Sequence, residues 1–119
     1  MYDCLKKSCY LEKYTIKKKY RSKIATAKNV IVCGAGAWGS RTILALADIG
    51  ISKFFIAVTR QDEHENYLLG NKVYNLCELD IKANCIVLVA VGIKYENEIV
   101  SYLEKNGYSN YILCKDYME

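Results

Sequence analysis

The feature that most constrains the fold is a pair of continuous apolar runs, residues 30–33 and 85–91, which are rich in β-branched side chains. Neither run alternates with polar residues, which is typical of strands buried on both faces by helices, as in the centre of a parallel sheet. The first run ends at a glycine cluster and leads into a helical pattern over residues 37–49, with Gly50 placed to end the helix. This order predicts an α/β fold.

The remaining chain continues the alternation of strands and helices. Further strands are predicted at residues 53–59, 73–74 and 111–114, and helical segments at residues 2–24, near 78–80 and at 96–106. Because crossovers between parallel strands are right-handed, few arrangements remain. We expect a doubly wound, mostly parallel sheet of about five strands in the order 3-2-1-4-5, preceded by an N-terminal helix.

Charge divides the chain unevenly. Residues 1–28 carry nine basic and two acidic side chains, a net charge of +7, whereas residues 29–119 carry eight basic and eleven acidic ones, a net charge of −3. We expect a basic helical arm (1–28) and a domain (29–119). The arm is a solvated helix, a dimerisation element, or a contact for an anionic membrane surface or nucleic acid. The arm has few large apolar residues to insert into a membrane, which makes a membrane contact weak. It also lacks the interleaved aromatic and basic residues of RNA-binding sheets, which argues against nucleic acid.

The cysteines indicate free thiols. Cys33, Cys85 and Cys114 fall within or at the end of apolar runs, where a thiol behaves as a small buried hydrophobic group. No CxxC pair is present, so we expect neither a metal site nor a redox site. No apolar stretch is long enough to cross a bilayer or to act as a signal peptide, and we therefore expect a cytoplasmic protein.

The glycine cluster has the spacing GxGxxG directly after a predicted strand and at the start of a predicted helix. Gly34 allows a tight turn, Gly36 lets the backbone approach a phosphate, and Gly39 lets the helix pack closely. A phosphate there accepts hydrogen bonds from the N–H groups of the helix start. Ser40 and Arg41 follow closely enough to add a hydroxyl and a positive charge. A turn inherited by a domain that has lost its ligand is the alternative.

The second strand ends in Thr59-Arg60, where NAD-binding domains place an acidic residue against the ribose. Thr59 offers one hydrogen bond and Arg60 favours a 2′-phosphate, so NAD, NADP and nucleotide sugars all remain open. Beside the turn, Val91 and Gly92 end the fourth strand, where Gly92 either keeps a crevice open or is an ordinary loop glycine. The candidate ligand-binding residues are Gly34, Ala35, Gly36, Ala37, Trp38, Gly39, Ser40, Thr59, Arg60, Val91 and Gly92.

No catalytic set is predicted. The Tyr-x-x-x-Lys spacing of short-chain dehydrogenases occurs three times, ending with Tyr111 and Lys115, but never on a helix after the fourth strand, where that chemistry requires it. The single histidine, His64, stands in a charged loop that reads as solvated.

The segments VIVCGAGAWGSRTILALADIGI, FFIAVT, GNKVYNLCELD and CIVLVAVGIKYENEIVSYLEKNGYSNYILC together resemble small Rossmann-type domains of bacterial sugar and polysaccharide enzymes. They are similar to the nucleotide-sugar-binding N-terminal domain of sugar acyltransferases, and to domains beside glycosyltransferases and methyltransferases of surface-polysaccharide synthesis. The hexamer GAGAWG also resembles the cofactor turn of glycerol-3-phosphate dehydrogenases. The first resemblance implies nucleotide binding over residues 28–115, with the reaction carried by a separate catalytic domain.

We therefore expect a Rossmann-like domain that binds a nucleotide or nucleotide sugar and is not catalytic alone, with a second copy or a catalytic domain as its partner. The alternatives are an NAD(P)-dependent oxidoreductase domain acting as an oligomer, and an interaction module with a vestigial glycine turn. The chain length of 119 residues leads us to expect no further catalytic domain within it.

Overall fold

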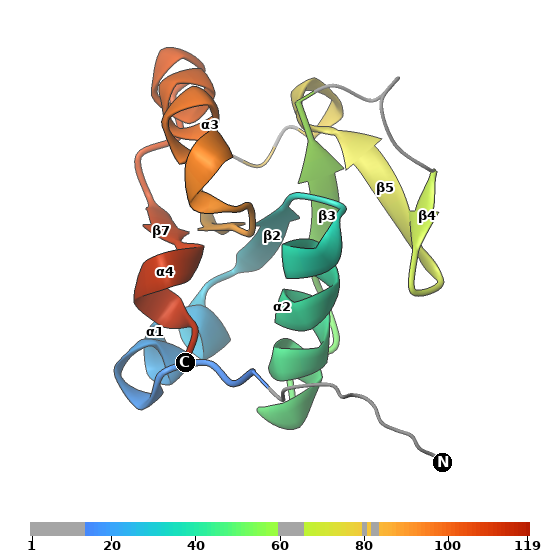
Figure 1. Ribbon diagram of the computed structural model, residues 1–119, viewed down its shortest axis with the longest axis vertical. Helices are drawn as coiled ribbons and strands as arrows, with labels where there is room; N and C mark the ends of the chain where they lie inside the picture. The colour runs from blue at the N-terminus through green and yellow to red at the C-terminus, as the bar shows by residue number, and fades with distance from the viewer. Residues whose placement is uncertain (1–13, 60–65, 80, 82–83) are drawn as a thin grey trace.

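The computed structural model describes residues 14–59, 66–79, 81 and 84–119 of the chain (Figure 1). Within them lies a six-stranded sheet with helices on both faces, which confirms an α/β fold with a mostly parallel sheet. The elements are α1 (Lys18–Thr26), β2 (Asn29–Cys33), α2 (Ala37–Asp48), β3 (Phe55–Val58), β4 (Tyr67–Leu68), β5 (Asn71–Asn75), the 3-10 turn η2 (Leu76–Glu78), β6 (Cys85–Val89), α3 (Ile93–Lys105), β7 (Tyr111–Leu113) and α4 (Cys114–Tyr117).

The two apolar runs form the centre of the sheet, as predicted. β2 pairs in parallel with β6, from Asn29 opposite Cys85 to Cys33 opposite Val89, and on its other side with β3. All five residues of β6 are buried. The strands β5 and β7, farther from the centre of the sheet, are buried only in part.

The predicted strand order of five is corrected by a sixth strand. The order is β4-β5-β3-β2-β6-β7, in which β4 pairs antiparallel with β5 at the edge. The two are joined by Leu69 and Gly70, which both have positive φ, as a two-residue hairpin turn of type I′ requires. The sequence does not indicate β4, because the strand is two residues long and leucine, here Leu69, is rare at the first position of such a turn.

The core has two layers, one on each face of the sheet. α1, α2 and α4 pack on one face, where Ile24, Leu46 and Tyr117 join the inward side chains of β2 and β6 (Figure 1). α3 packs on the opposite face through Ile99 and Leu103. The sheet is thus covered on both sides, which explains why its central strands carry no polar alternation.

The described part of the basic arm belongs to this core. Residues 14–17 are not helical, contrary to the prediction, because Ile16 forms an antiparallel bridge with Met118 and Thr15 exchanges backbone hydrogen bonds with Glu119. Ile16 and Ile24 are fully buried. The rest of the predicted helix, residues 2–13, lies outside the described residues.

Several element boundaries also differ from the predictions, and β5 is longer than the strand predicted at residues 73–74. β3 and β6 are shorter than predicted, η2 precedes the expected position of the turn, and α3 begins at Ile93 rather than at residue 96. The last strand ends at Leu113, because the chain turns there into the short helix α4, which the sequence pattern did not reveal. No helix in the described part of the chain is long and apolar enough to span a bilayer.

Candidate functional site

The turn between β2 and α2 uses two of its three glycines for steric reasons within the chain. Gly34 has φ +135°, and a Cβ there would lie 2.3 Å from the Ala90 carbonyl oxygen. A Cβ on Gly39 would lie 2.3 Å from the Gly34 carbonyl oxygen. The first glycine therefore permits the turn to press against the end of β6, and the second permits the first turn of α2 to press against the turn.

The third glycine, Gly36, has no such reason. A Cβ added there would meet no described atom within 4 Å, and its φ of −99° lies in a range open to other residues. Gly36 is exposed and precedes the first residue of α2, where no side chain caps the helix. The space in front of its Cα is consequently accessible to a molecule from outside the chain.

The turn lies where the strand order reverses. The chain leaves β2 toward β3 on one side of it, and it leaves β6 toward β7 on the other side. These two connections therefore diverge at the carboxyl ends of the neighbouring strands β2 and β6. Open α/β sheets bind their ligands at such a point. Gly34 donates a backbone hydrogen bond to Ala57 of β3, and Ala90 donates one to Cys33 of β2, which fixes the three strand ends together.

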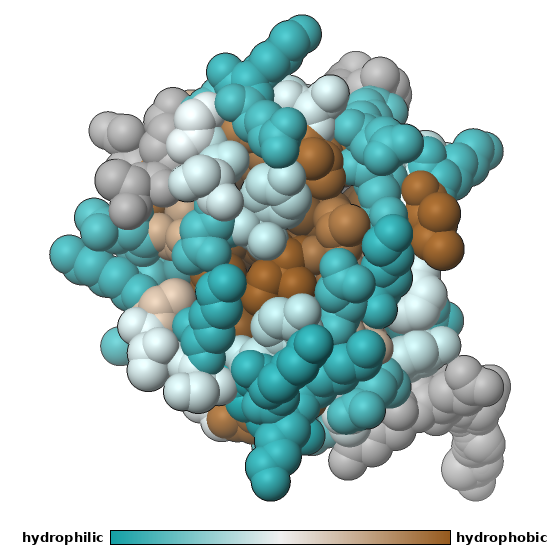
Figure 2. Space-filling view, turned by 90° about the vertical axis from the view of Figure 1, so that its left-hand side faces the viewer, coloured by the Kyte–Doolittle hydropathy of each residue, from teal (hydrophilic) through white to brown (hydrophobic). Residues whose placement is uncertain are grey.

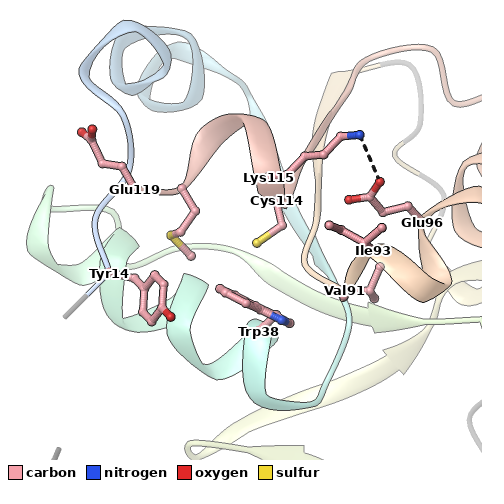
Figure 3. Close-up of a pocket in the computed structure, with 10 residues that line it drawn as sticks. Tyr14, Trp38, Val91, Ile93, Glu96, Cys114, Lys115 and Glu119 are labelled. Atoms are coloured by element: carbon pink, nitrogen blue, oxygen red, sulfur yellow. Dashed lines mark ion pairs between the residues drawn. The ribbon is translucent and has the colours of Figure 1, made fainter. Parts of the chain in front are cut away.

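A cavity of about 360 Å³ opens on the β6 side of this point. Its volume lies within the usual range for small-molecule sites. The face on which α3, β7 and α4 lie has apolar surface at its centre, surrounded by hydrophilic side chains (Figure 2). The cavity is lined by Tyr14, Trp38, Val91, Gly92, Ile93, Glu96, Cys114, Lys115, Met118 and Glu119 (Figure 3).

Aromatic rings form one wall of the cavity. Trp38, in the first turn of α2, meets Tyr14 edge to face with their ring centroids 5.1 Å apart. The Arg41 guanidinium lies 4.5 Å from the centroid of the Trp38 ring and 5.0 Å from that of Tyr14. Arg41 was expected to offer its charge to a phosphate at the turn, but here the charge lies over the two rings.

One carboxylate is buried in the opposite wall. Glu96 of α3 has a side chain that is 8% exposed, and its Oε1 lies 3.5 Å from Nζ of Lys115, which is 53% exposed. The second oxygen, Oε2, is buried and accepts no hydrogen bond from any described residue. The cavity wall therefore holds an acceptor that receives no hydrogen bond from the part of the chain that the structure describes.

The structure brings together only part of the predicted ligand-binding set. Trp38, Val91 and Gly92 share the cavity, and a Cβ on Gly92 would lie 3.9 Å from Trp38 Nε1. The other turn residues do not line the cavity, although Gly34 contacts the segment that does. Thr59 follows β3 at the same edge of the sheet, half-buried and away from the cavity lining, and Arg60 lies outside the described residues.

The cavity residues that sequence reasoning missed come from both ends of the described chain and from α3. Glu96 carried a signal, because it stands three residues before the buried Ile99 on the inward side of a predicted helix. The sequence pointed to Lys115 only through its spacing from Tyr111. The two have different partners, since the Tyr111 hydroxyl donates to Glu104 Oε2 at 2.7 Å while Lys115 pairs with Glu96. Tyr14 and Met118 carried no signal, because the bridge of Ile16 to Met118 joins residues from opposite ends of the chain.

The thiols near the site are poor nucleophiles. Cys33, Cys85 and Cys114 are buried thiols, as predicted, and of these Cys33 ends β2 just before the turn and Cys114 lines the cavity. Burial raises the pKa of the Cys33 thiol to about 12, and it also raises the pKa of Cys114. Where the structure describes the chain, no three metal-ligating side chains gather into a possible metal site.

Comparisons with protein-family models, curated proteins and solved structures gave no match.

Proposed function

We propose that the chain is a Rossmann-type domain that binds the phosphate of a nucleotide or nucleotide sugar at the turn from Gly34 to Gly39. In this proposal the domain catalyses no reaction alone and works with a catalytic domain, a partner protein or a second copy, in the modification of sugars or surface polysaccharides. Buried thiols that form no disulfide in the described chain fit a reducing, cytoplasmic setting.

The observation that carries the proposal is the open space at Gly36. Gly34 and Gly39 are explained by contacts inside the chain, whereas the chain places no described atom within 4 Å of a Cβ on Gly36. A glycine at this position is useful when a ligand approaches the backbone more closely than a side chain would permit.

The position of the turn supports an anionic ligand. The first N–H groups of a helix have no intrahelical acceptor, and the helix dipole favours negative charge near them. Those of α2 start at exposed residues, Gly36 and Ala37, at the carboxyl edge of the parallel strands. A phosphate placed there would meet both donors and a favourable potential.

The ligand class rests on two further points. Thr59 at the end of β3 offers a hydroxyl rather than the carboxylate that favours NAD, which supports a nucleotide sugar over NAD. The resemblance of the chain to nucleotide-sugar-binding domains supports the same choice. The interaction module is the second candidate, because the steric roles of Gly34 and Gly39 would persist after loss of a ligand.

Thermal unfolding with a ligand panel separates these functions. The panel contains UDP-glucose, a CDP-sugar, NAD, NADP and S-adenosylmethionine. A ligand at 100 times its Kd stabilises the folded chain by about 2.7 kcal/mol. We expect a UDP- or CDP-sugar to raise the melting temperature and Gly36→Val to abolish that rise without lowering the melting temperature of the free chain.

The control is Ala47→Val, which also places a valine at an exposed position, near the other end of α2, and should keep the ligand response. Stabilisation by NAD or NADP alone would favour the oxidoreductase domain. No response to any member of the panel would favour the interaction module and reject the proposal.

A further inference from the structure

One buried oxygen of Glu96 has no hydrogen-bond donor among the described residues. The residue is 6% exposed, and its Oε2 has no hydrogen-bond partner among the described residues. A buried charged acceptor without a donor is unfavourable, so native structures usually supply a partner from the chain, from water or from a ligand. Figure 3 shows this carboxylate directed into the space between α3 and α4.

A charged donor suits the second oxygen of Glu96. Lys115 is the basic residue of the lining, and it meets only Oε1 from a half-exposed position. The guanidinium of Arg41 lies over the Trp38 and Tyr14 rings instead. Because a carboxylate accepts its strongest hydrogen bonds from charged donors, an ammonium gains more at Oε2 than a neutral donor does.

The remaining walls favour an organic body. Opposite Glu96 lie the rings of Trp38 and Tyr14. The apolar lining is completed by Val91, Ile93 and Met118. Apolar and aromatic walls with a few placed polar groups are typical of small-molecule sites. An inorganic cation would leave these walls without a partner, whereas an amine on an apolar group would use both features.

We propose that the cavity between α3, α4 and Trp38 binds a small organic ammonium ion, with the ammonium donating to Glu96 Oε2 and the apolar part packed against Trp38. The site is separate from the phosphate site at Gly36, and it does not depend on a nucleotide being bound. A hydrogen bond between charged groups is worth about 1–2 kcal/mol more than a neutral one, which corresponds to a preference of about tenfold for an amine over the matching alcohol.

The single tryptophan of the chain makes the test direct, because Trp38 lines the cavity and its fluorescence reports occupancy. The full chain is titrated at pH 7 with 2-phenylethylamine and with its neutral counterpart 2-phenylethanol. We expect both to change the Trp38 emission, with a Kd about tenfold lower for the amine. Glu96→Gln keeps the shape of the side chain and should reduce the preference to within about twofold.

The matched control is Glu98→Gln, an exposed position on the same helix, which should keep the preference for the amine. A second variant, Lys115→Met, removes the competing cation and should strengthen amine binding, so the proposal stays testable if Glu96→Gln does not fold. Equal affinity for amine and alcohol, an unchanged preference in Glu96→Gln, or no change in emission up to about 10 mM amine would mean that only water meets Glu96 and would overturn the proposal.

Discussion

Substituting the glycines of the turn one at a time should separate the residue kept for a ligand from those kept for the fold. In Gly34→Ala the new Cβ would lie 2.3 Å from the Ala90 carbonyl oxygen, a backbone atom that cannot rotate away, and φ +135° is a region that alanine rarely adopts. The backbone strain costs about 1–3 kcal/mol and the overpacking about 1–3 kcal/mol, so we expect a loss of about 2–6 kcal/mol.

Gly36→Ala is the matched comparison, because it adds the same methyl group two residues further on. No described atom lies within 4 Å of that position, so the stability should stay within about 0.5 kcal/mol of the wild-type value. For a chain of this length 1 kcal/mol corresponds to about 4 °C in Tm. We therefore expect Tm to fall by about 8 °C or more in Gly34→Ala and by less than about 2 °C in Gly36→Ala.

The assay is thermal unfolding followed by far-UV circular dichroism, with urea unfolding to confirm the free-energy differences. The reasoning is refuted if Gly36→Ala falls as far as Gly34→Ala, because Gly36 would then have a structural role and the space before it would carry no argument for a ligand. An unchanged Tm in Gly34→Ala would show that the turn does not have the described geometry.

Three further predictions concern the core and its thiols. Tyr117→Phe removes the partner of the fully buried Thr42 hydroxyl, 2.9 Å away, and should lower the free energy of unfolding in urea by about 1–3 kcal/mol. Adding Thr42→Val to this variant should recover part of the loss, and full additivity of the two changes would argue against the hydrogen bond. Iodoacetamide at pH 8, followed by mass spectrometry of each site, should alkylate the exposed Cys77 at least about a hundredfold faster than Cys33, and comparable rates would mean that β2 is accessible. The pKa of Cys33 rises from 9.0 to about 12 on folding, so its contribution to stability is complete below pH 9 and is lost between pH 9 and 12, at up to about 1.4 kcal/mol per pH unit. In urea unfolding, the free energy of unfolding of Cys33→Ala should decline less over this range than that of the wild type. An identical decline would contradict the raised pKa.

The central strands and the helix after the glycine turn could be predicted from local pattern alone. β2 and β6 are buried on both faces, so their sequences carry no alternation, and α2 lies between a glycine turn and Gly50, which has positive φ. Glycine spacing also predicted which turn residues face steric crowding. Gly34 and Gly39 fulfil the roles expected of a tight turn and a close helix contact.

The rest depended on contacts between distant residues. β4 is only two residues long and needs β5 beside it, and α4 is a single turn held by the buried side chains of Cys114 and Tyr117. The cavity joins Tyr14, Glu96 and Lys115, whose proximity follows from the bridge of Ile16 to Met118 and from the packing of α3. No window of local sequence contains that information. Trp38, Val91 and Gly92 were predicted as ligand-binding residues, and beyond them the charged Glu96 on an inward helix face was the sequence signal for the cavity.

The central claim, that a nucleotide phosphate binds at the start of α2, is tested most directly by titrating the ¹⁵N-labelled chain with UDP-glucose and, separately, with NAD, while its amide resonances are followed by NMR. The account predicts that the sugar nucleotide produces the largest shifts at the amides of Gly36, Ala37 and Trp38, which donate to the phosphate. Saturable shifts centred elsewhere, or no shifts at these amides with either compound at millimolar concentration, would contradict it.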